Sequence, residues 1–560
     1  MLQERASGPP GRLKESGRQE GGYMEHFKLP AGVRDVLPEE SGALDEAEAL
    51  LREKFARAGF RSVRTAGLEY YDTFTQIRSP VEPTKMFKMT DKDGNLIVLR
   101  PDMTLACARI AATKMHGDRA RLSYVSNIYD FSGGGSSDRE VAQAGVEIFG
   151  EAGAESDAYA IAFAVECLRA IGLEDFVVDI GHVGFYKGLL EESGLTPGQA
   201  EELRGYSNAK DSVNMEIALR ASGAPARVQA AILALPSLFG GVEVLDAAEK
   251  LTDNAQARAS LAHLKQVYAH LCRAGVEKYV SFDLGTVKSL SYYSGMVFTG
   301  LAAGVGAPVL SGGRYDGLCA QFGRDLSAVG FAIGMMRALR AREARASAVR
   351  ETGVVNVALA KGRLAAECAD TFIRCGIRAE ILKEETRKLV LETPDQKFRF
   401  FFVKPSDVPT YVEYGVADIG IVGKDTLLEA DAELYEMLDL GFEKCRLCLA
   451  GFPEKREELG KPHLRVATKY VHTAKKLFAS RGEDAEIIPL HGSIELAPLT
   501  GLSDVIFDIV QSGGTLRANG LVVLEEVFDI SARLIANKVS LKTKAAILPL
   551  IREIGKYIGD

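Results

Sequence analysis

The sequence has no long apolar run, no block of basic residues and no cluster of cysteines. A membrane-spanning helix needs about 20 consecutive apolar residues, so none is expected. A net charge of −8 and the missing basic block argue against a large nucleic-acid-binding surface. Eight scattered cysteines favour a reducing cytoplasm over a disulfide framework. Cys445 and Cys448 form one C-x-x-C without a second pair, which indicates core packing rather than a zinc or redox site.

The chain also lacks long-range repeats, and its 560 residues are too many for one core, so we expect three or four compact units. Residues 1–23 have almost no apolar side chains and no signal-peptide core. We expect a disordered tail there, with Met24 as an alternative start. Apolar residues recur at helical spacing over 39–60, and residues 60–71 alternate as in a strand. A mainly helical block is expected at about 190–275. His182 ends an apolar run and fits a core histidine better than a ligand contact.

One stretch, residues 503–520, combines a buried strand with a glycine-rich turn. The β-branched run 505–510 is interrupted by Asp508 and is followed by Ser512-Gly513-Gly514-Thr515. Such a turn at the carboxyl end of a strand lets backbone amides converge on a phosphate. Asp508 would face ribose hydroxyls or their magnesium. The stretch alone fits a phosphoribose site and a tight turn leaving a core strand equally well.

Five motifs in the first half carry a family resemblance. They read "LPAGVRDVLPEE", "LRPDMTLACARI", "AQAGVEIFG", "SLSYYSGMVF" and "GGRYDGLCAQFG" with "AVGFAIGMMRAL". Their order over residues 25–340 resembles histidyl-tRNA synthetase. The resemblance implies the class II synthetase fold, an antiparallel sheet flanked by helices, for residues 24–337.

The departures from that family concern its ATP-binding positions. Tyr129 and Phe131 stand at the places of the motif-2 arginine and glutamate, and Asp130 puts an anion where phosphate should bind. Lys288 replaces the catalytic arginine and loses its bidentate fork. An anticodon-binding domain is missing. This half therefore resembles the synthetase-derived regulatory subunit of ATP phosphoribosyltransferase.

The amino-acid pocket of that family is better preserved. Acids can hold an ammonium or an imidazole N–H, and tyrosines can enclose the ring. We expect a regulatory histidine site, although relics of an ancestral site would look the same. The positions that match the family's histidine contacts are Asp102, Thr104, Gln143, Glu147, Tyr292 and Tyr293.

The second half changes to alternating strands and helices, which is α/β organisation. The strings "VALAKGRLAAE", "KPSDVPTYVEYGVADIGIVGKDTLLE" and "IIPLHGSIELAPLTGLSDVIFDIVQSGGTLRANGL" resemble the short-form catalytic chain of ATP phosphoribosyltransferase. That resemblance implies two lobes similar to those of periplasmic binding proteins. We expect a multidomain chain of α+β and α/β units, with a linker at 338–352, lobe one at 353–446, lobe two at 447–540 and a C-terminal helix at 541–560 that returns to lobe one.

The implied reaction joins ATP to phosphoribosyl pyrophosphate and releases pyrophosphate. Phosphoribosyl pyrophosphate is assigned to Asp504, Asp508, Ser512, Gly513, Gly514 and Thr515. ATP or pyrophosphate is assigned to Lys361, Gly362, Arg363, Arg387, Lys404 and Glu495, although each cation alone is more often a surface charge. Mg²⁺ is expected to bridge pyrophosphate oxygens, with few protein ligands.

The two resemblances together predict a fusion of regulatory and catalytic chains, inhibited by histidine. Because the separate chains form a hetero-octamer, the fusion should form a homotetramer. One alternative is an RNA-linked role for the first half, which Tyr129, Asp130, Lys288 and the charge oppose. Another is a protein that only senses a small ligand, which would not need the 508–515 loop.

Overall fold

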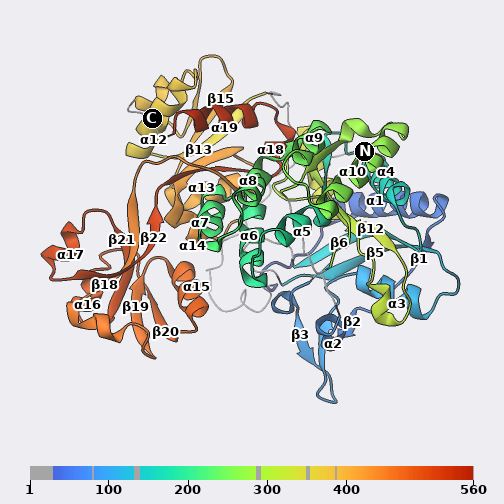
Figure 1. Ribbon diagram of the computed structural model, residues 1–560, viewed down its shortest axis with the longest axis horizontal. Helices are drawn as coiled ribbons and strands as arrows, with labels where there is room; N and C mark the ends of the chain where they lie inside the picture. The colour runs from blue at the N-terminus through green and yellow to red at the C-terminus, as the bar shows by residue number, and fades with distance from the viewer. Residues whose placement is uncertain are drawn as a thin grey trace, which may run out of the picture.

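The structure is a computed structural model that describes residues 29–77, 81–131, 139–285, 292–347, 353–384 and 387–558. The expected tail at 1–23, Lys288 and residues 348–352 of the expected linker lie outside these ranges, whereas 338–347 belong to a helix, α11 (Met335–Ser347). The first half is built on one nine-stranded sheet (Figure 1). Its strands, in spatial order, are β1 (Arg61–Ser62), β5 (Ala120–Tyr129), β6 (Glu140–Phe149), β12 (Ala328–Gly334), β11 (Leu310–Arg314), β10 (Met296–Ala302), β7 (Phe176–His182), β9 (Val280–Asp283) and β8 (Phe239–Gly240).

Most neighbouring strands of this sheet are antiparallel; β1–β5 and β7–β9 are the parallel pairs. A smaller sheet pairs β4 (Leu96–Leu99) with both β2 (Leu68–Tyr70) and β3 (Lys88–Thr90). Alternation along β6 sends Ala144, Val146 and Ile148 into the main core on one face. Glu147 points to the opposite face, so the strand separates a packed core from a candidate pocket.

Helices cover both faces of the nine-stranded sheet. Three of them, α1 (Pro38–Arg57), α4 (Ala154–Ala170) and α11 (Met335–Ser347), contribute to the main core, and α3 (Thr104–Thr113) lies on the face that carries Glu147. The helical block after β7 contains α5 (Val183–Glu191), α6 (Pro197–Ala209), α7 (Ser212–Ser222), α8 (Ala226–Ala234), α9 (Glu243–Glu249) and α10 (Ala255–Arg273). Helices α6, α7 and α8 of this block lie between the first sheet and the second half, whereas α10 lies beside α4 (Figure 1).

The second half contains two sheets, one in each lobe. The first has the order β14 (Val390–Glu392), β15 (Phe398–Val403), β13 (Val355–Ala360), β16 (Ile419–Gly423), β23 (Ala532–Ala536) and β17 (Tyr435–Asp439). The second has the order β20 (Ala485–Pro489), β19 (Leu464–Thr468), β21 (Val505–Val510), β18 (Cys445–Gly451) and β22 (Val522–Ile530). The class II-like and α/β fold classes expected from the sequence are confirmed.

The chain crosses between the lobes twice, from β17 to β18 and from β22 to β23. Ser531 alone separates β22 from β23, and β23 pairs with β16 and β17 in the lobe-one sheet. The expected end of lobe two at residue 540 was therefore wrong, because residues 522–536 resemble a strand throughout, with no glycine or proline to show where the chain changes sheets. β18 likewise begins at Cys445, inside the expected lobe one.

The remaining helices lie around the two α/β sheets. They are α12 (Arg363–Arg374), α13 (Val408–Glu413), α14 (Lys424–Ala430), α15 (Val471–Arg481), α16 (Leu496–Leu499), α17 (Gly514–Ala518), α18 (Ser540–Thr543) and α19 (Ile547–Lys556), and α2 (Tyr71–Thr75) lies in the first half. Ile547, Ile551 and Ile554 of α19 belong to the same core as Leu534 of β23. Within the described ranges, no helix is both long and apolar enough to cross a membrane.

Short 3₁₀ helices occur in the connections. They are η2 (Pro83–Lys85), η3 (Leu235–Ser237), η4 (Glu277–Tyr279), η5 (Cys319–Phe322), η6 (Glu380–Lys383), η7 (Pro405–Asp407) and η8 (Pro453–Glu458).

Candidate functional site

The glycine-rich turn of the second half lies at the carboxyl end of β21. β21 ends at Val510, and α17 begins at Gly514. Gly513 between them has φ 69°, a left-handed conformation that glycine adopts without steric cost. Ser512, Gly514 and Thr515 are exposed. The turn therefore presents amides and hydroxyls to solvent, as a phosphate-binding turn requires.

Asp508 lies on β21, two residues before the end of the strand, and is half-buried. Burial raises the pKa of its carboxyl, while the Ile509 amide, 2.8 Å from Oδ1, and the Lys469 charge act in the opposite direction. The nearby carboxylates Glu495 and Asp425 raise the pKa further. The structure thus brings Asp508, Glu495 and a cation to one place.

Asp504 does not belong to this group, which corrects one of the assignments made from the sequence. It precedes β21, so about 20 Å of strand separates it from the turn. Its carboxylate pairs with Arg465 and with Lys455, both at 3.1 Å. The Arg465 hydrogen bond is the main reason that its pKa falls to about 2. Asp504 is a structural ion-pair partner at the wrong end of the strand.

Lobe one presents its cations at the matching edge of its own sheet. Lys361 follows β13 and Lys404 follows β15, and these parallel strands end in register at Ala360 and Val403. Arg387 lies near the same edge. Leu389, two residues later, accepts a hydrogen bond from the amide of Phe402 at 2.9 Å, and Phe402 is the next-to-last residue of β15. The carboxyl ends of strands in open α/β sheets are where ligands bind. Gly362 has φ 108° before α12, and the side chain of Arg363 lies outside the described set.

The sequence interpretation missed Lys469, Tyr470 and Asp425. Lys469 directly follows β19, and its charge acts on Asp508. The Tyr470 hydroxyl donates to Asp425 Oδ2 at 2.8 Å and so joins lobe two to lobe one. The sequence could have indicated Lys469, since this lysine follows an apolar strand, as Lys404 does.

The candidate pocket of the first half is centred on Glu147, which is 1% exposed. Thr104 Oγ1 donates to Glu147 Oε1 at 2.8 Å, and the Tyr315 hydroxyl donates to Oε2. Across the sheet, Gly330 stands opposite Glu147, and a Cβ there would come within 1.8 Å of Glu147 Oε2. Glycine at position 330 therefore makes room for the carboxylate.

The other predicted pocket residues surround this carboxylate. Gln143 lies on the same face of β6, two pleats from Glu147. The ring centroid of Tyr292 lies 4.7 Å from that of Tyr293 and 5.6 Å from that of Tyr315. Tyr315, which the sequence interpretation did not single out, lies within the quoted "GGRYDGL" motif. A buried aromatic wall thus encloses two acids.

Both acids have strongly raised pKa values. Burial raises the pKa of Glu147 to about 8 and that of Asp102 to about 6, although the Leu105 amide (2.8 Å) stabilises ionised Asp102. Over the described part of the chain, neither acid has an ion-pair partner. A pocket with two desolvated carboxylates and aromatic walls suits a ligand that brings positive charge.

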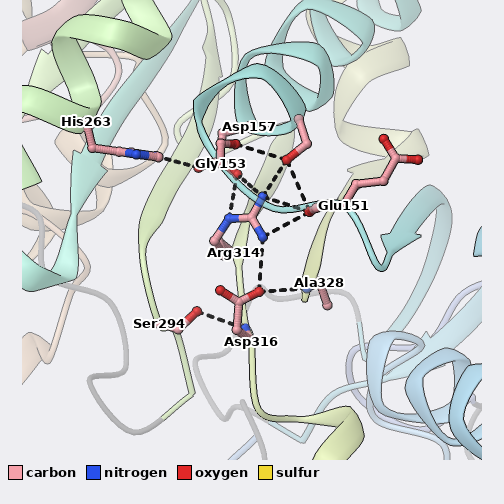
Figure 2. A network of polar contacts seen from close by, with 9 residues as sticks. Glu151, Gly153, Asp157, His263, Ser294, Arg314, Asp316 and Ala328 are labelled. Atoms are coloured by element: carbon pink, nitrogen blue, oxygen red, sulfur yellow. Dashed lines mark hydrogen bonds and ion pairs between the residues drawn. The ribbon is translucent and has the colours of Figure 1, made fainter. Parts of the chain in front are cut away.

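An ion network lies behind this pocket (Figure 2). Arg314 Nε donates to Asp157 Oδ1 at 2.8 Å, and its Nη1 donates to Asp316 Oδ1 at 3.0 Å. Asp157 also contacts His263 Nε2 at 2.7 Å, and the Asp316 amide donates to the Ser294 hydroxyl. Arg314 directly precedes Tyr315, so the network fixes the backbone that carries the pocket's hydroxyl.

His182, near this network, is a core residue. Its Nδ1 accepts from the Gly184 amide at 3.1 Å and caps α5. Burial lowers its pKa to about 4.

The former ATP positions carry side chains that do not suit phosphate. The Tyr129 hydroxyl bonds Glu140 at 3.3 Å. Phe131 packs edge-on against Phe87, with ring centroids 4.9 Å apart, and is 42% exposed. Lys288, the third departure, is outside the described residues.

Comparisons with known proteins agree with both halves. Residues 32–338 match the family model for histidyl-tRNA synthetase, and residues 404–556 match that for ATP phosphoribosyltransferase. An ATP phosphoribosyltransferase regulatory subunit of Acetivibrio thermocellus is 40% identical over 318 residues, covering 56% of this chain and 76% of the relative. An ATP phosphoribosyltransferase of Caldicellulosiruptor saccharolyticus is 53% identical over 207 residues, covering 37% of this chain and 99% of the relative.

A solved structure agrees with the first half. It is described as an ATP phosphoribosyltransferase regulatory subunit/histidyl-tRNA synthetase from Bacillus halodurans, with 32% identity and a TM-score of 0.54. It covers 64% of this chain and 92% of that one. The chain therefore belongs, through its first half, to the histidyl-tRNA synthetase-like regulatory subunits of ATP phosphoribosyltransferase and, through its second half, to the ATP phosphoribosyltransferases themselves.

Proposed function

We propose that this ATP phosphoribosyltransferase is inhibited by histidine bound in its own first half. The second half joins N1 of ATP to C1 of phosphoribosyl pyrophosphate as the bond from C1 to pyrophosphate breaks. The observation that carries the regulatory part is a pair of acids, buried Glu147 and half-buried Asp102, whose pKa values are raised by desolvation and which have no ion-pair partner among the described residues.

In the catalytic half, the sugar carbon gains positive charge as pyrophosphate leaves. The turn formed by Ser512, Gly513, Gly514 and Thr515 would hold the 5′-phosphate through amides and hydroxyls. Asp508 would bind the ribose hydroxyls. In lobe one, the cations Lys361, Arg387 and Lys404 at the carboxyl ends of the strands would neutralise the phosphates of ATP and the departing pyrophosphate. Gly362 directly precedes α12, and Arg363 is the first residue of that helix.

The carboxylates fit a weakly held magnesium ion. Asp508 and Glu495 lie close enough for each charge to affect the other. The described residues form no group of three or more His, Cys, Asp or Glu side chains suited to a metal. Asp508 and Glu495 could contribute oxygens to Mg²⁺, which would neutralise the leaving pyrophosphate.

In the first half, histidine would place its positive charge between the two acids. Thr104 and Tyr315 orient Glu147, Gln143 adds an amide, and Tyr292 and Tyr293 enclose the imidazole. Aromatic side chains stand at the former ATP positions, so we infer that binding occurs without amino-acid activation.

The decisive assay follows pyrophosphate release with both substrates, with and without histidine. Histidine should inhibit the wild-type enzyme, and Asp102→Ala should weaken that inhibition. Glu166→Ala, which removes an acid on the outer face of α4, is the control. Equal inhibition of the wild type and Asp102→Ala would place the regulatory site elsewhere. Histidine-dependent exchange of pyrophosphate into ATP without the sugar substrate would favour the tRNA-linked alternative.

We also infer that the fused chain forms a homotetramer. Closed symmetric assemblies are the usual outcome for enzymes of this kind. Light scattering at micromolar concentration should give four times the chain mass of 60.5 kDa. A monomer would contradict the inference.

A further inference from the structure

Helix α14 occupies the junction of the first half with both lobes. It is seven residues long and begins directly at the end of β16. The Lys424 amide donates to Ser531 O at 3.0 Å. Since Ser531 alone links β22 to β23, the start of α14 is attached to one of the two connections between the lobes.

The first half holds α14 through a buried ion pair. Lys424 Nζ lies 3.0 Å from Asp211 Oδ2, and it also pairs with Glu436 of β17. The Lys424 and Asp211 side chains are 11% and 5% exposed. Asp211 lies between α6 and α7 and caps α7 by accepting from the Asn214 amide at 3.0 Å. An ion pair this buried is costly to break, so it fixes one geometry.

The same helix holds lobe two. Asp425 accepts from the Tyr470 hydroxyl at 2.8 Å. Glu429 accepts from the amides of His472 and Thr473, at 2.9 and 3.0 Å, and so satisfies donors at the start of α15. Lys476 of α15 pairs with Asp431, directly after α14. The three acids of α14 and its end thus bind the segment that begins beside Lys469, the cation that acts on Asp508.

A second branch of the network reaches the inter-lobe connections. Glu436 lies 3.3 Å from Arg533 Nε, and Arg533 Nη1 lies 2.7 Å from Asp439 Oδ2. The Ser531 hydroxyl donates to Asp439 Oδ1 at 2.7 Å. Asp439 ends β17, where the chain leaves for lobe two. Ion pairs and one hydrogen bond therefore connect Asp211, through Lys424, with Ser531.

A cavity of about 410 Å³ adjoins these contacts. The first half, lobe one and lobe two all contribute to its lining, which includes Tyr206 of α6, Leu427 of α14, Leu477 of α15 and Phe528 of β22. In Figure 1, α6 and α7 lie beside α14. Interiors are otherwise close-packed, so this space allows α14 and the α15 segment that it holds to shift against α6 at low steric cost.

We propose that Asp211 is a positioning residue for catalysis: its ion pair with Lys424 sets α14 and, through α14, the placement of lobe two over lobe one. The regulatory part of this inference rests on histidine binding in the first half. Histidine would change turnover by altering how the α6–α7 junction holds Lys424. Asp211 touches no substrate; it acts through Lys424.

The test compares histidine binding with histidine inhibition in Asp211→Asn. Asparagine keeps the cap on α7 but removes the charge. Asp211→Ser, which also caps, is the second variant if the first is poorly folded. Asp253→Asn is the matched control, because Asp253 pairs with Arg227 and Arg258 within the insertion. Calorimetry measures the histidine dissociation constant, and pyrophosphate release measures kcat, KM and inhibition.

We expect Asp211→Asn to bind histidine within about twofold of wild type while inhibition weakens about tenfold, within the usual range of allosteric coupling. Without histidine, kcat/KM should fall roughly fivefold, and adding Lys424→Met should lower it little further, because coupled partners are not additive. Asp253→Asn should match wild type in all three measurements.

Wild-type inhibition together with wild-type kcat/KM in Asp211→Asn would overturn the proposal. Parallel loss of histidine binding and inhibition would also overturn it, because the residue would then support only the fold of the first half. If the wild-type enzyme binds no histidine, the proposed regulation fails by itself. The change in kcat/KM then decides the positioning role alone.

Discussion

The two candidate sites of this chain handle charged ligands in opposite ways. The first-half pocket holds two carboxylates whose pKa values burial raises, with tyrosines beside them. The second-half site is open, with exposed amides and hydroxyls at 512–515 and cations at the edges of two sheets. A buried acid discriminates strongly because it must be compensated, whereas an open site allows substrates and pyrophosphate to exchange.

The largest effect is expected in the open site. Thr515→Ala and Asp508→Asn should each lower turnover about a hundredfold or more, because phosphate and ribose contacts are lost where charge develops. Melting should change little, since Thr515 is exposed. Asp504→Asn, directly before the same strand, is the control and should keep turnover near wild type. Near-normal turnover in the first two variants would remove the turn from the mechanism.

A substitution in the first-half pocket should change histidine binding rather than turnover. Glu147→Ala should weaken histidine binding by about 2 kcal/mol, some thirtyfold, because a charged hydrogen bond is lost. Turnover without histidine should stay near wild type, since Glu147 and Asp508 lie in different sheets. Calorimetry and pyrophosphate release measure the two quantities separately. Wild-type histidine affinity in this variant would separate Glu147 from the ligand.

Histidine affinity should rise by more than about tenfold as the pH increases from 6 to 7.5. The pKa of Glu147 in the empty pocket is about 8 and that of Asp102 about 6, so a positively charged ligand must displace protons at lower pH. Calorimetry in buffers of different ionisation enthalpy would detect the released protons. A flat profile without proton release would show that both acids are already ionised.

The last expected effect concerns stability. The folded-state pKa of Glu147 lies above its ordinary value of 4.5, so its contribution is present at low pH and declines as the pH rises toward 8. Glu147→Gln should therefore raise the free energy of unfolding of the first half at pH 8 by about 2 kcal/mol relative to wild type. At pH 5 the two proteins should unfold alike. Denaturation at both pH values tests the difference, and a gain at pH 5 equal to that at pH 8 would contradict it.

Local pattern was sufficient for several elements of both sites. The β-branched run after Asp504 predicted a strand over 505–510, which is where β21 lies. The sequence Asp91-Lys92-Asp93-Gly94 is typical of a hairpin turn, and it connects β3 with β4. Alternation over 60–71 failed, because the chain forms β1, leaves the large sheet and enters β2 of the small one. Period-two alternation does not reveal a change of sheet.

The sequence by itself determined the two families, the strand–turn that carries 508–515 and the acids of the first-half pocket. These depend on short runs of residues whose periodicity and chemistry are local. Only the tertiary structure decided that Asp504 lies at the wrong end of β21, that Tyr315 completes the pocket, and that β23 returns to lobe one. It also decided that Asp211 meets Lys424, 213 residues apart. Such contacts arise because burial of apolar faces brings distant segments together, and pairs of charges enclosed in this way leave no periodic signal in the sequence.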